Sequence, residues 1–253
     1  MIDVVTRAQS KDLFERMKKS ALETAYEVPR FDYEMDPDGL PHCADTYNRL
    51  GKKGTADVIC FVHDDVEFLS KDWDVVVHDL WIEHRFDVLG VIGSKVYNGG
   101  ALFDAGSVHG VGLVGGDVDG QTAMRILSPR LRYAPVKVVD GLILFVSREF
   151  FARNPFDEAF DELFYYDVDL CLRAEKVAVT CDVWVKHWKP KAMYGVYPEG
   201  MKKREDYDVL LKAKHGTQEA PRGDQTCAMM MWPDFVRLGQ TNGFEGFKRK
   251  YTK

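Results

Sequence analysis

Acids and imidazoles follow apolar segments at several places in this chain. Residues 58–62 are continuously apolar, and His63, Asp64 and Asp65 come directly after them. Two adjacent carboxylates repel each other, and a divalent cation that carries a phosphorylated ligand would offset that repulsion. A turn between a strand and a helix, with an aspartate as the helix cap, gives the same residue pattern. This segment alone does not decide between a cation site and a helix cap.

Two further groups of the same chemical kind lie downstream. Asp167 and Asp169 open a segment with helical periodicity, and His187 ends an apolar segment. Carboxylates together with an imidazole suit Mg²⁺ or Mn²⁺ better than zinc. Each residue also has an ordinary structural explanation, because acids are favoured in the first turn of a helix and a single histidine is commonly a core or surface residue. The coincidence of three such groups favours a metal site.

The elements that must position these residues alternate along the sequence. Strand-like segments lie at 1–6, 58–62, 88–96, 136–146 and 177–185, and helical periodicity at 11–22, 42–50, 75–86, 166–176 and 201–215. Such alternation is typical of an α/β protein with a mostly parallel central sheet and helices on both faces. The carboxyl ends of parallel strands point to one edge of a sheet, so we expect the acids and His187 to meet there.

Two other segments carry local signals. Residues 70–74 resemble a capping box for the helix at 75–86. The glycine-dense residues 98–120 predict a loop or a bent pair of strands.

The composition excludes several classes of protein. The chain has 253 residues, a net charge of −6 and 45% hydrophobic residues, which is ordinary for a soluble globular protein and unfavourable for general nucleic-acid binding. It contains no apolar run long enough for a membrane span, and its first residues lack the layout of a secretion signal. The five cysteines are odd in number and form no C-x-x-C pair. We therefore expect a protein of the reducing cytoplasm.

Four segments resemble the family 2-like glycosyltransferases of the GT-A fold. They are residues 58–66, ending in Val-His-Asp-Asp-Val; 139–150, with Asp-Gly before an apolar strand and Arg-Glu after it; 156–174, with Phe-Asp-Glu and Tyr-Asp-Val-Asp-Leu-Cys-Leu-Arg; and 183–187, ending in histidine. The resemblance implies a single domain, 1–253, with a Rossmann-like nucleotide-diphospho-sugar transferase fold. Within it, 1–100 would bind the nucleotide sugar, 101–197 would form the acceptor and catalytic half, and 198–253 a C-terminal extension.

The resemblance also implies roles for individual residues. Asp65 and His187 would hold Mn²⁺ or Mg²⁺, and Asp167 would act as the general base. The donor side would include His63, Asp64, Thr6, Arg7 and Asn48. The acceptor side would include Asp140, Gly141, Tyr166, Asp169 and Trp188. Two positions depart from the family's acidic motifs, as in a subset with a Val-His-Asp-Asp-Val strand end: His63 replaces the first aspartate of Asp-x-Asp, and Tyr166 replaces the glutamate beside the base.

By this resemblance we expect an enzyme that moves a hexose or pentose from a nucleoside-diphosphate sugar to an acceptor hydroxyl on a glycan. A UDP-sugar is favoured as donor and a GDP-sugar is the second candidate. Direct displacement with Asp167 as base would invert the anomeric configuration.

Three alternatives stay open. A sugar-nucleotide nucleotidyltransferase has a related fold, but residues 1–19 lack its glycine-rich triphosphate loop. An inactive nucleotide- or carbohydrate-binding protein of this fold would not need both Asp65 and Asp167. A glycosyltransferase of modified nucleic acid is disfavoured by the acidic net charge, although residues 247–253 are basic.

Overall fold

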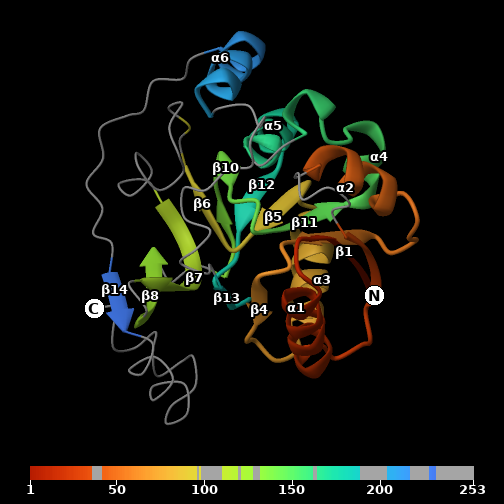
Figure 1. The fold of residues 1–253 in the computed structure, drawn as a ribbon, viewed down its shortest axis with the longest axis vertical. Helices are drawn as coiled ribbons and strands as arrows, with labels where there is room; N and C mark the ends of the chain where they lie inside the picture. The colour runs from red at the N-terminus through yellow and green to blue at the C-terminus, as the bar shows by residue number, and fades with distance from the viewer. Residues whose placement is uncertain are drawn as a thin grey trace.

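A seven-stranded sheet lies at the centre of the computed structural model of this chain (Figure 1). The structure describes residues 1–35, 42–95, 97, 110–118, 121–127, 132–161, 164–188, 204–216 and 228–231. The sheet contains β1 (Ile2–Ala8), β2 (Arg30–Met35), β3 (Val58–Val62), β5 (Val88–Gly90), β9 (Ala134–Pro135), β11 (Ile143–Ser147) and β12 (Val177–Val179), in the order β2-β1-β3-β11-β5-β12-β9. β1 is parallel to β2 and β3, and β5 to β12, whereas β11 and β9 run antiparallel to their neighbours. The predicted α/β class with a mostly parallel central sheet is confirmed.

The structure contains a second sheet, several of whose strands directly follow strands of the first sheet along the chain. This second sheet contains β4 (Val66–Phe68), β6 (Ile92–Ser94), β7 (Gly110–Val118), β10 (Val138–Val139) and β13 (Val185–His187), in the order β10-β6-β7-β13-β4; β8 (Gln121–Leu127) pairs with β7, and β14 (Ala228–Met231) pairs with β8. β7 occupies part of the glycine-dense segment, whose residues 98–109, 119 and 120 lie outside the described residues.

The predictions of single strands over 88–96 and 177–185 are wrong. Each segment divides between the two sheets, because β5 is followed by β6 and β12 by β13. A largely apolar segment does not reveal where a chain passes from one sheet to another, because residues of both sheets are buried at this point. The break predicted at Asp140-Gly141 does separate β10 from β11.

Helices cover both faces of the central sheet (Figure 1). They are α1 (Lys11–Thr24) and α3 (Trp73–His84) on one face, and α2 (Cys43–Gly51), α4 (Arg148–Arg153) and α5 (Tyr166–Arg173) on the other, with the 3-10 turn η2 (Glu158–Phe160) before α5. The helix α6 (Arg204–His215) lies beyond α5 (Figure 1). Among the described residues, no helix combines the length and apolar character that a membrane span requires.

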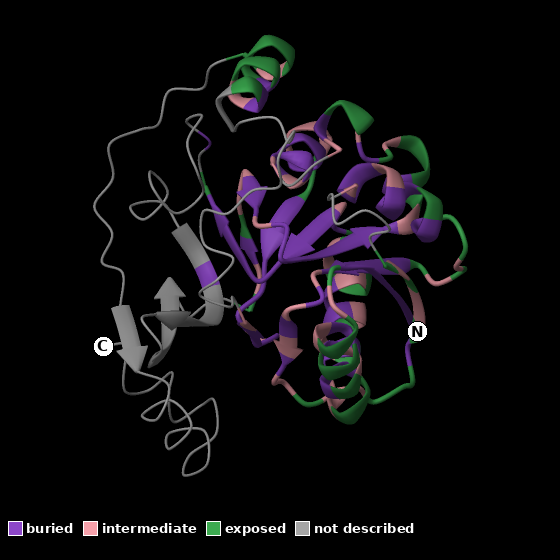
Figure 2. Ribbon diagram, in the orientation of Figure 1, coloured by how far each residue is buried: buried purple, intermediate pink, exposed green. Residues whose placement is uncertain are grey.

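The strand β3 shows why its sequence is continuously apolar. Cys60 belongs to the same hydrophobic core as Phe14 of α1 and Trp73 of α3, whereas the next residue, Phe61, packs against Tyr47 of α2. Both faces of the strand are therefore covered by helices, and every residue of β3 is buried (Figure 2). The carboxyl end of β3 is the first place where this segment can present polar groups.

The starts of α1 and α3 differ in how they are capped. Ser10 caps α1, and its side-chain oxygen accepts a hydrogen bond from the amide of Leu13. The capping box at residues 70–74 is wrong: Asp72 precedes α3 in a left-handed conformation (φ 56°) and its side chain caps nothing. Asp74 instead accepts hydrogen bonds from the amides of Tyr26 (2.7 Å) and Glu27 (2.9 Å), and so ties the end of α1 to α3.

Candidate functional site

The end of β3 and the strand β13 bring candidate residues from distant parts of the sequence together. Residues 63–65 form the turn between β3 and β4, and β13 runs antiparallel beside β4. The amide of Trp188 also donates to the carbonyl oxygen of Asp65 (2.7 Å). These backbone pairings place His187 beside Asp65.

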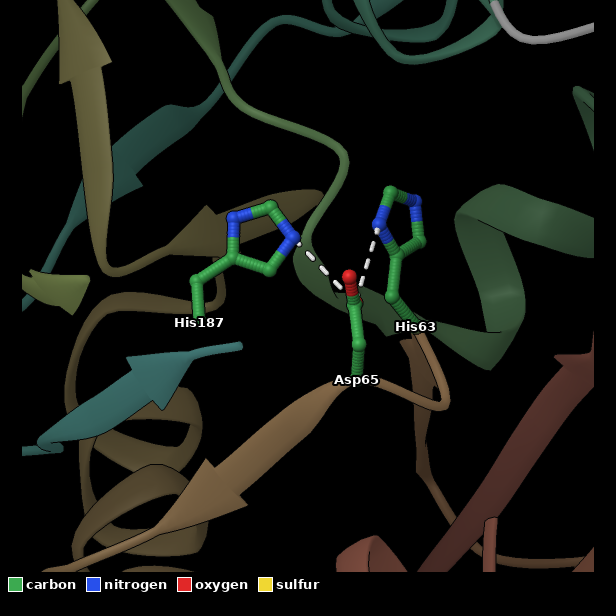
Figure 3. A group of neighbouring side chains, drawn as sticks. All are labelled: His63, Asp65 and His187. Atoms are coloured by element: carbon green, nitrogen blue, oxygen red, sulfur yellow. Dashed lines mark ion pairs between the residues drawn. The ribbon is translucent and has the colours of Figure 1, made fainter. Parts of the chain in front are cut away.

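The side chains of His63, Asp65 and His187 form a cluster that suits a divalent cation (Figure 3). One ligand atom of each lies within 4.8 Å of the other two. Oδ1 of Asp65 is 3.2 Å from Nε2 of His187 and 4.0 Å from Nδ1 of His63. Apart from this ion-pair contact with Asp65, the buried Nε2 of His187 makes no hydrogen bond to any described residue. Atoms at these separations can surround one cation at bond lengths of roughly 2.0–2.5 Å, so the donor set fits a metal ion.

The phenol of Tyr166, the first residue of α5, lies behind this cluster. Its oxygen is 2.7 Å from Nε2 of His63, and it donates a hydrogen bond to the carbonyl oxygen of Gly141 (3.2 Å). Tyr166 is buried between the rings of Tyr47 and Phe156. Burial raises the pKa of Tyr166 above its ordinary value, so the phenol keeps its proton.

Asp167 follows Tyr166 and is partly buried. Its Oδ2 accepts a hydrogen bond from the amide of Gly141 (2.6 Å), and its Oδ1 accepts one from the amide of Val168 (2.8 Å). Burial, followed by the nearby charge of Asp140, raises the pKa of Asp167 to about 7, although the two amides lower it. A carboxylate with this pKa can accept a proton near neutral pH, as a general base must.

Gly141 lies between the phenol and the base. A Cβ atom at this position would collide with the hydroxyl of Tyr166 and would lie 3.0 Å from Oδ2 of Asp167. Asp140 accepts a hydrogen bond from the amide of Leu142 (2.9 Å), which holds the turn that presents Gly141. Only glycine therefore fits between the two side chains without a rearrangement.

Three residues predicted on the donor side hold the ends of β1 and β3 together. Asp64 accepts hydrogen bonds from the amides of Gln9 (2.7 Å) and Ser10 (2.9 Å), and burial raises its pKa. The hydroxyl of Thr6 is fully buried and donates to the carbonyl oxygen of Val62 (2.9 Å). Arg7 is 6% exposed and lies near Asp64. These contacts shape the strand ends beside the cluster, and Thr6 has no exposed surface for a nucleobase.

Asn48 connects two elements away from the cluster. Its side-chain amide donates to the carbonyl oxygen of Phe156 (2.9 Å) and its side-chain oxygen accepts from the amide of the same residue (2.9 Å). Asn48 therefore connects α2 to the segment before η2, and its contact with the donor stays a prediction.

Asp169 is fully buried among basic side chains. Nε of Arg173 (2.9 Å), Nζ of Lys214 (2.7 Å) and Nε2 of His215 (2.8 Å) all surround its carboxylate. Asp169 thus joins α5 to α6 and has no exposed surface for an acceptor. Sequence reasoning did not identify Lys214 or His215, and the only signal was the basic character of the last turn of α6.

Trp188 already has partners on its ring and its nitrogen. The indole Nε1 donates to Oε2 of Glu67 (2.6 Å), and Nζ of Lys186 lies 3.0 Å from the ring centroid. The guanidinium of Arg16 is 4.6 Å from the same centroid. The ring thus contacts two cations, and its contact with an acceptor stays a prediction.

The chain is similar to known glycosyltransferases in sequence profile and in fold. Residues 8–208 match the model of a family described as "Glycosyltransferase like family". No curated protein matches the sequence. Among solved structures, GalNAc-T7 with UDP, GalNAc and Mn²⁺ has a TM-score of 0.56 at 11% identity, covering 84% of this chain and 48% of that one.

Two further solved structures have a comparable fold. The mannosyltransferase PcManGT from Pyrobaculum calidifontis, in complex with GDP-Man and Mn²⁺, has a TM-score of 0.51 at 10% identity, with 76% of this chain and 58% of that one covered. TarS 1–349 from S. aureus, in complex with UDP-GlcNAc, has a TM-score of 0.50 at 12% identity, with 78% and 61% covered. This chain thus spans about half to three-fifths of the three structures. At such identities the likeness concerns the fold.

Proposed function

The chain belongs to the Glycosyltransferase like family and has the GT-A fold, and on that basis we propose that it transfers a sugar from a nucleoside-diphosphate sugar to an acceptor hydroxyl. The observation that carries the proposal is the arrangement around Gly141. The hydroxyl of Tyr166 contacts both His63 of the cluster and the carbonyl oxygen of Gly141. Asp167 accepts a hydrogen bond from the amide of Gly141. A site for the leaving diphosphate and a proton acceptor thus adjoin one residue.

The donor side consists of the cation cluster. Two imidazole nitrogens and one carboxylate favour Mn²⁺ over Mg²⁺, because Mg²⁺ prefers oxygen ligands in octahedral geometry. When bound there, the cation would neutralise negative charge that develops on the leaving diphosphate. The UDP- and GDP-sugar ligands and the Mn²⁺ of the similar structures support a nucleotide-sugar donor, with a UDP-sugar as first candidate.

The acceptor side consists of Asp167 and its surroundings. Asp167 removes the proton of the acceptor hydroxyl as that oxygen attacks the anomeric carbon. The amide of Gly141 fixes the direction of the carboxylate. Burial, followed by the charge of Asp140, keeps the pKa of Asp167 high enough for proton removal near neutral pH. Attack opposite the leaving group inverts the anomeric configuration. A glycan hydroxyl is the acceptor class that we propose.

The same reasoning extends to the setting in which the protein works. Cys43, Cys60, Cys171 and Cys181 are buried and form no disulfide with one another, which supports the reducing cytoplasm as the compartment. Residues 247–253 lie outside the described residues, so the basic segment adds no structural support for a nucleic-acid acceptor.

Nucleotide release tests the proposal. UDP- and GDP-sugars are incubated with the protein and Mn²⁺, with EDTA as the negative control, and released UDP or GDP is quantified with and without a panel of glycan acceptors. We expect nucleoside diphosphate release that depends on Mn²⁺ and increases with the acceptor. Release of pyrophosphate from a nucleoside triphosphate and a sugar phosphate would instead identify a nucleotidyltransferase, and no turnover with any donor would indicate a binding protein.

A further inference from the structure

The two positions that depart from the acidic motifs of similar enzymes hold side chains that contact each other. His63 and Tyr166 are separated by 103 residues, yet Nε2 of the imidazole lies 2.7 Å from the phenol oxygen. The other ring nitrogen of His63, Nδ1, is the one that faces Asp65. The contact therefore joins the rear of a proposed metal ligand to the first residue of α5.

The direction of the hydrogen bond between His63 and Tyr166 follows from the contact of Tyr166 with Gly141. The carbonyl oxygen of Gly141 can only accept, so its 3.2 Å contact with the phenol is a hydrogen bond only if Tyr166 donates its single proton there. The phenol oxygen must then accept from the imidazole, and the proton of a neutral His63 lies on Nε2. In this tautomer Nδ1 carries a lone pair directed toward the cluster.

We propose that Tyr166 is a positioning residue of the metal site, which holds His63 in the Nε2–H tautomer so that Nδ1 can ligate the cation. The inference rests on the proposed function, because it assigns a supporting partner to that cation site. Metal-ligating histidines commonly donate their second N–H to a group that fixes the ring, and such partners affect affinity strongly. Here the partner is a neutral phenol instead of a carboxylate.

The surroundings explain why a phenol suits this position. A carboxylate at residue 166 would face the carbonyl oxygen of Gly141 and would add a third negative charge beside Asp140 and Asp167. The phenol can satisfy both neighbours, and its ring is held by contacts with Tyr47 (5.9 Å between centroids) and Phe156 (5.8 Å). The histidine at 63 and the tyrosine at 166 thus form one functional pair.

The matched variants Tyr166→Phe and Tyr47→Phe test this pair. Both remove one hydroxyl from a buried ring of the same aromatic cluster, but the hydroxyl of Tyr47 makes no hydrogen bond to any described residue. Free Mn²⁺ is measured by electron paramagnetic resonance during titration, without donor and again with saturating UDP. We expect Tyr166→Phe to weaken Mn²⁺ binding by roughly 10- to 100-fold. Tyr47→Phe should bind Mn²⁺ like the unmodified protein.

The tautomer of His63 provides a second readout that needs no metal. Long-range ¹H–¹⁵N correlation spectra of the metal-free protein, at a pH above the histidine titration range, report which ring nitrogen carries the proton. The signals of His63 are assigned by their loss in His63→Gln. We expect an Nε2–H ring in the unmodified protein and in Tyr47→Phe, and a mixture of tautomers in Tyr166→Phe.

The outcomes separate this inference from the proposed function. Suppose that the unmodified protein binds Mn²⁺ and that His63→Gln weakens this binding, whereas Tyr166→Phe does not. The positioning role of Tyr166 would then be wrong, and the cation site would still stand. A ring of His63 with its proton on Nδ1 would likewise overturn the inference. If the unmodified protein binds no Mn²⁺ even with UDP, both this inference and the metal-dependent function fall.

Discussion

Asp167 shows how opposing effects set the chemistry of one residue. Two backbone amides stabilise its charged form, whereas burial and the charge of Asp140 destabilise it, and the pKa of about 7 is the result. The protonated form is thus favoured by the fold. The stabilising contribution of this group is complete below an unfolded pKa of about 3.9 and is lost as pH rises through about 7. A residue that weakens the fold when charged is a candidate for a functional role.

Replacement of the proposed base should separate binding from transfer. We expect Asp167→Asn to bind a nucleotide sugar with nearly unchanged affinity, because it alters none of the three cation ligands, and to lower turnover by about 10²- to 10⁴-fold. Calorimetric donor titration and initial-rate kinetics measure the two quantities. The exposed Asp79 of α3 provides the control, and Asp79→Asn should leave both unchanged. Near-normal turnover of Asp167→Asn would disprove the assignment of the base.

The pH profile should report the same carboxylate. Below about pH 7 Asp167 is increasingly protonated and cannot accept the acceptor proton, so kcat/KM should fall as the pH decreases. Asp140→Asn removes the neighbouring charge that raises this pKa, and the acidic limb should move to lower pH. Initial rates measured across the pH range, with Mn²⁺ held saturating, check the shift. An unmoved limb in Asp140→Asn would mean that another group controls it.

The three cation ligands should act as one unit. We expect Asp65→Ala and His187→Ala to lose Mn²⁺-dependent donor binding, by more than the roughly 100-fold that loss of an outer partner produces. His84 stacks on Tyr133 and stands outside the cluster, so His84→Ala is the matched control. Donor titrations with Mn²⁺ and with EDTA measure the effect. Donor affinity that is equal in EDTA and Mn²⁺ would contradict a cation role for the cluster.

At the scale of elements, the most consequential contact joins α6 to α5. Asp169 is fully buried and faces Arg173, Lys214 and His215, while Lys214 also contacts Asp157 (2.6 Å). The hydroxyl of Tyr165 donates to Asp208 of α6 (2.6 Å). Part of the predicted C-terminal extension is therefore bound to the helix that carries Asp167. Changes in α6 can in this way affect the helix that carries the proposed base.

Removal of the buried carboxylate should release this attachment. We expect Asp169→Ala to lower the free energy of unfolding by about 3 kcal/mol, because three basic side chains lose a common buried partner. Among them, Lys214 keeps a second carboxylate, that of Asp157. Urea denaturation measures the loss, and hydrogen exchange should show faster exchange in residues 204–215. Asp79→Ala is the control, with a change of no more than about 0.5 kcal/mol. Equal protection of α6 in Asp169→Ala and the unmodified protein would show that other contacts hold it.

At the scale of the whole molecule, the sequence predicted the α/β architecture and which residues lie together. It did not predict which strands carry those residues. The apolar run of β3 and the alternation of elements were sufficient for the central sheet with helices on both faces. His187 was expected on a parallel strand of that sheet, but it reaches Asp65 from the second sheet, antiparallel to β4. The single-domain prediction over 1–253 and its three segments remain predictions.

Individual contacts could not be predicted, because polar side chains choose backbone partners that are distant in sequence. Asp64, Thr6 and Asn48 bond to backbone groups 54 to 108 residues away, and Asp169 finds partners 45 and 46 residues away in another helix. A motif indicates that a residue has a role, but it does not show whether that role is catalytic or structural. Burial and hydrogen-bond partners supply the distinction here.

Gly141 has a practical consequence for anyone who wishes to alter this enzyme. Its carbonyl oxygen contacts Tyr166 and its amide contacts the proposed base Asp167, and the missing methyl group leaves room for both side chains. A mutagenic library that randomises residue 141 would be filled with inactive clones, whatever donor or acceptor is sought. A library should vary positions that do not contact Tyr166 or Asp167, and residue 141 should remain glycine.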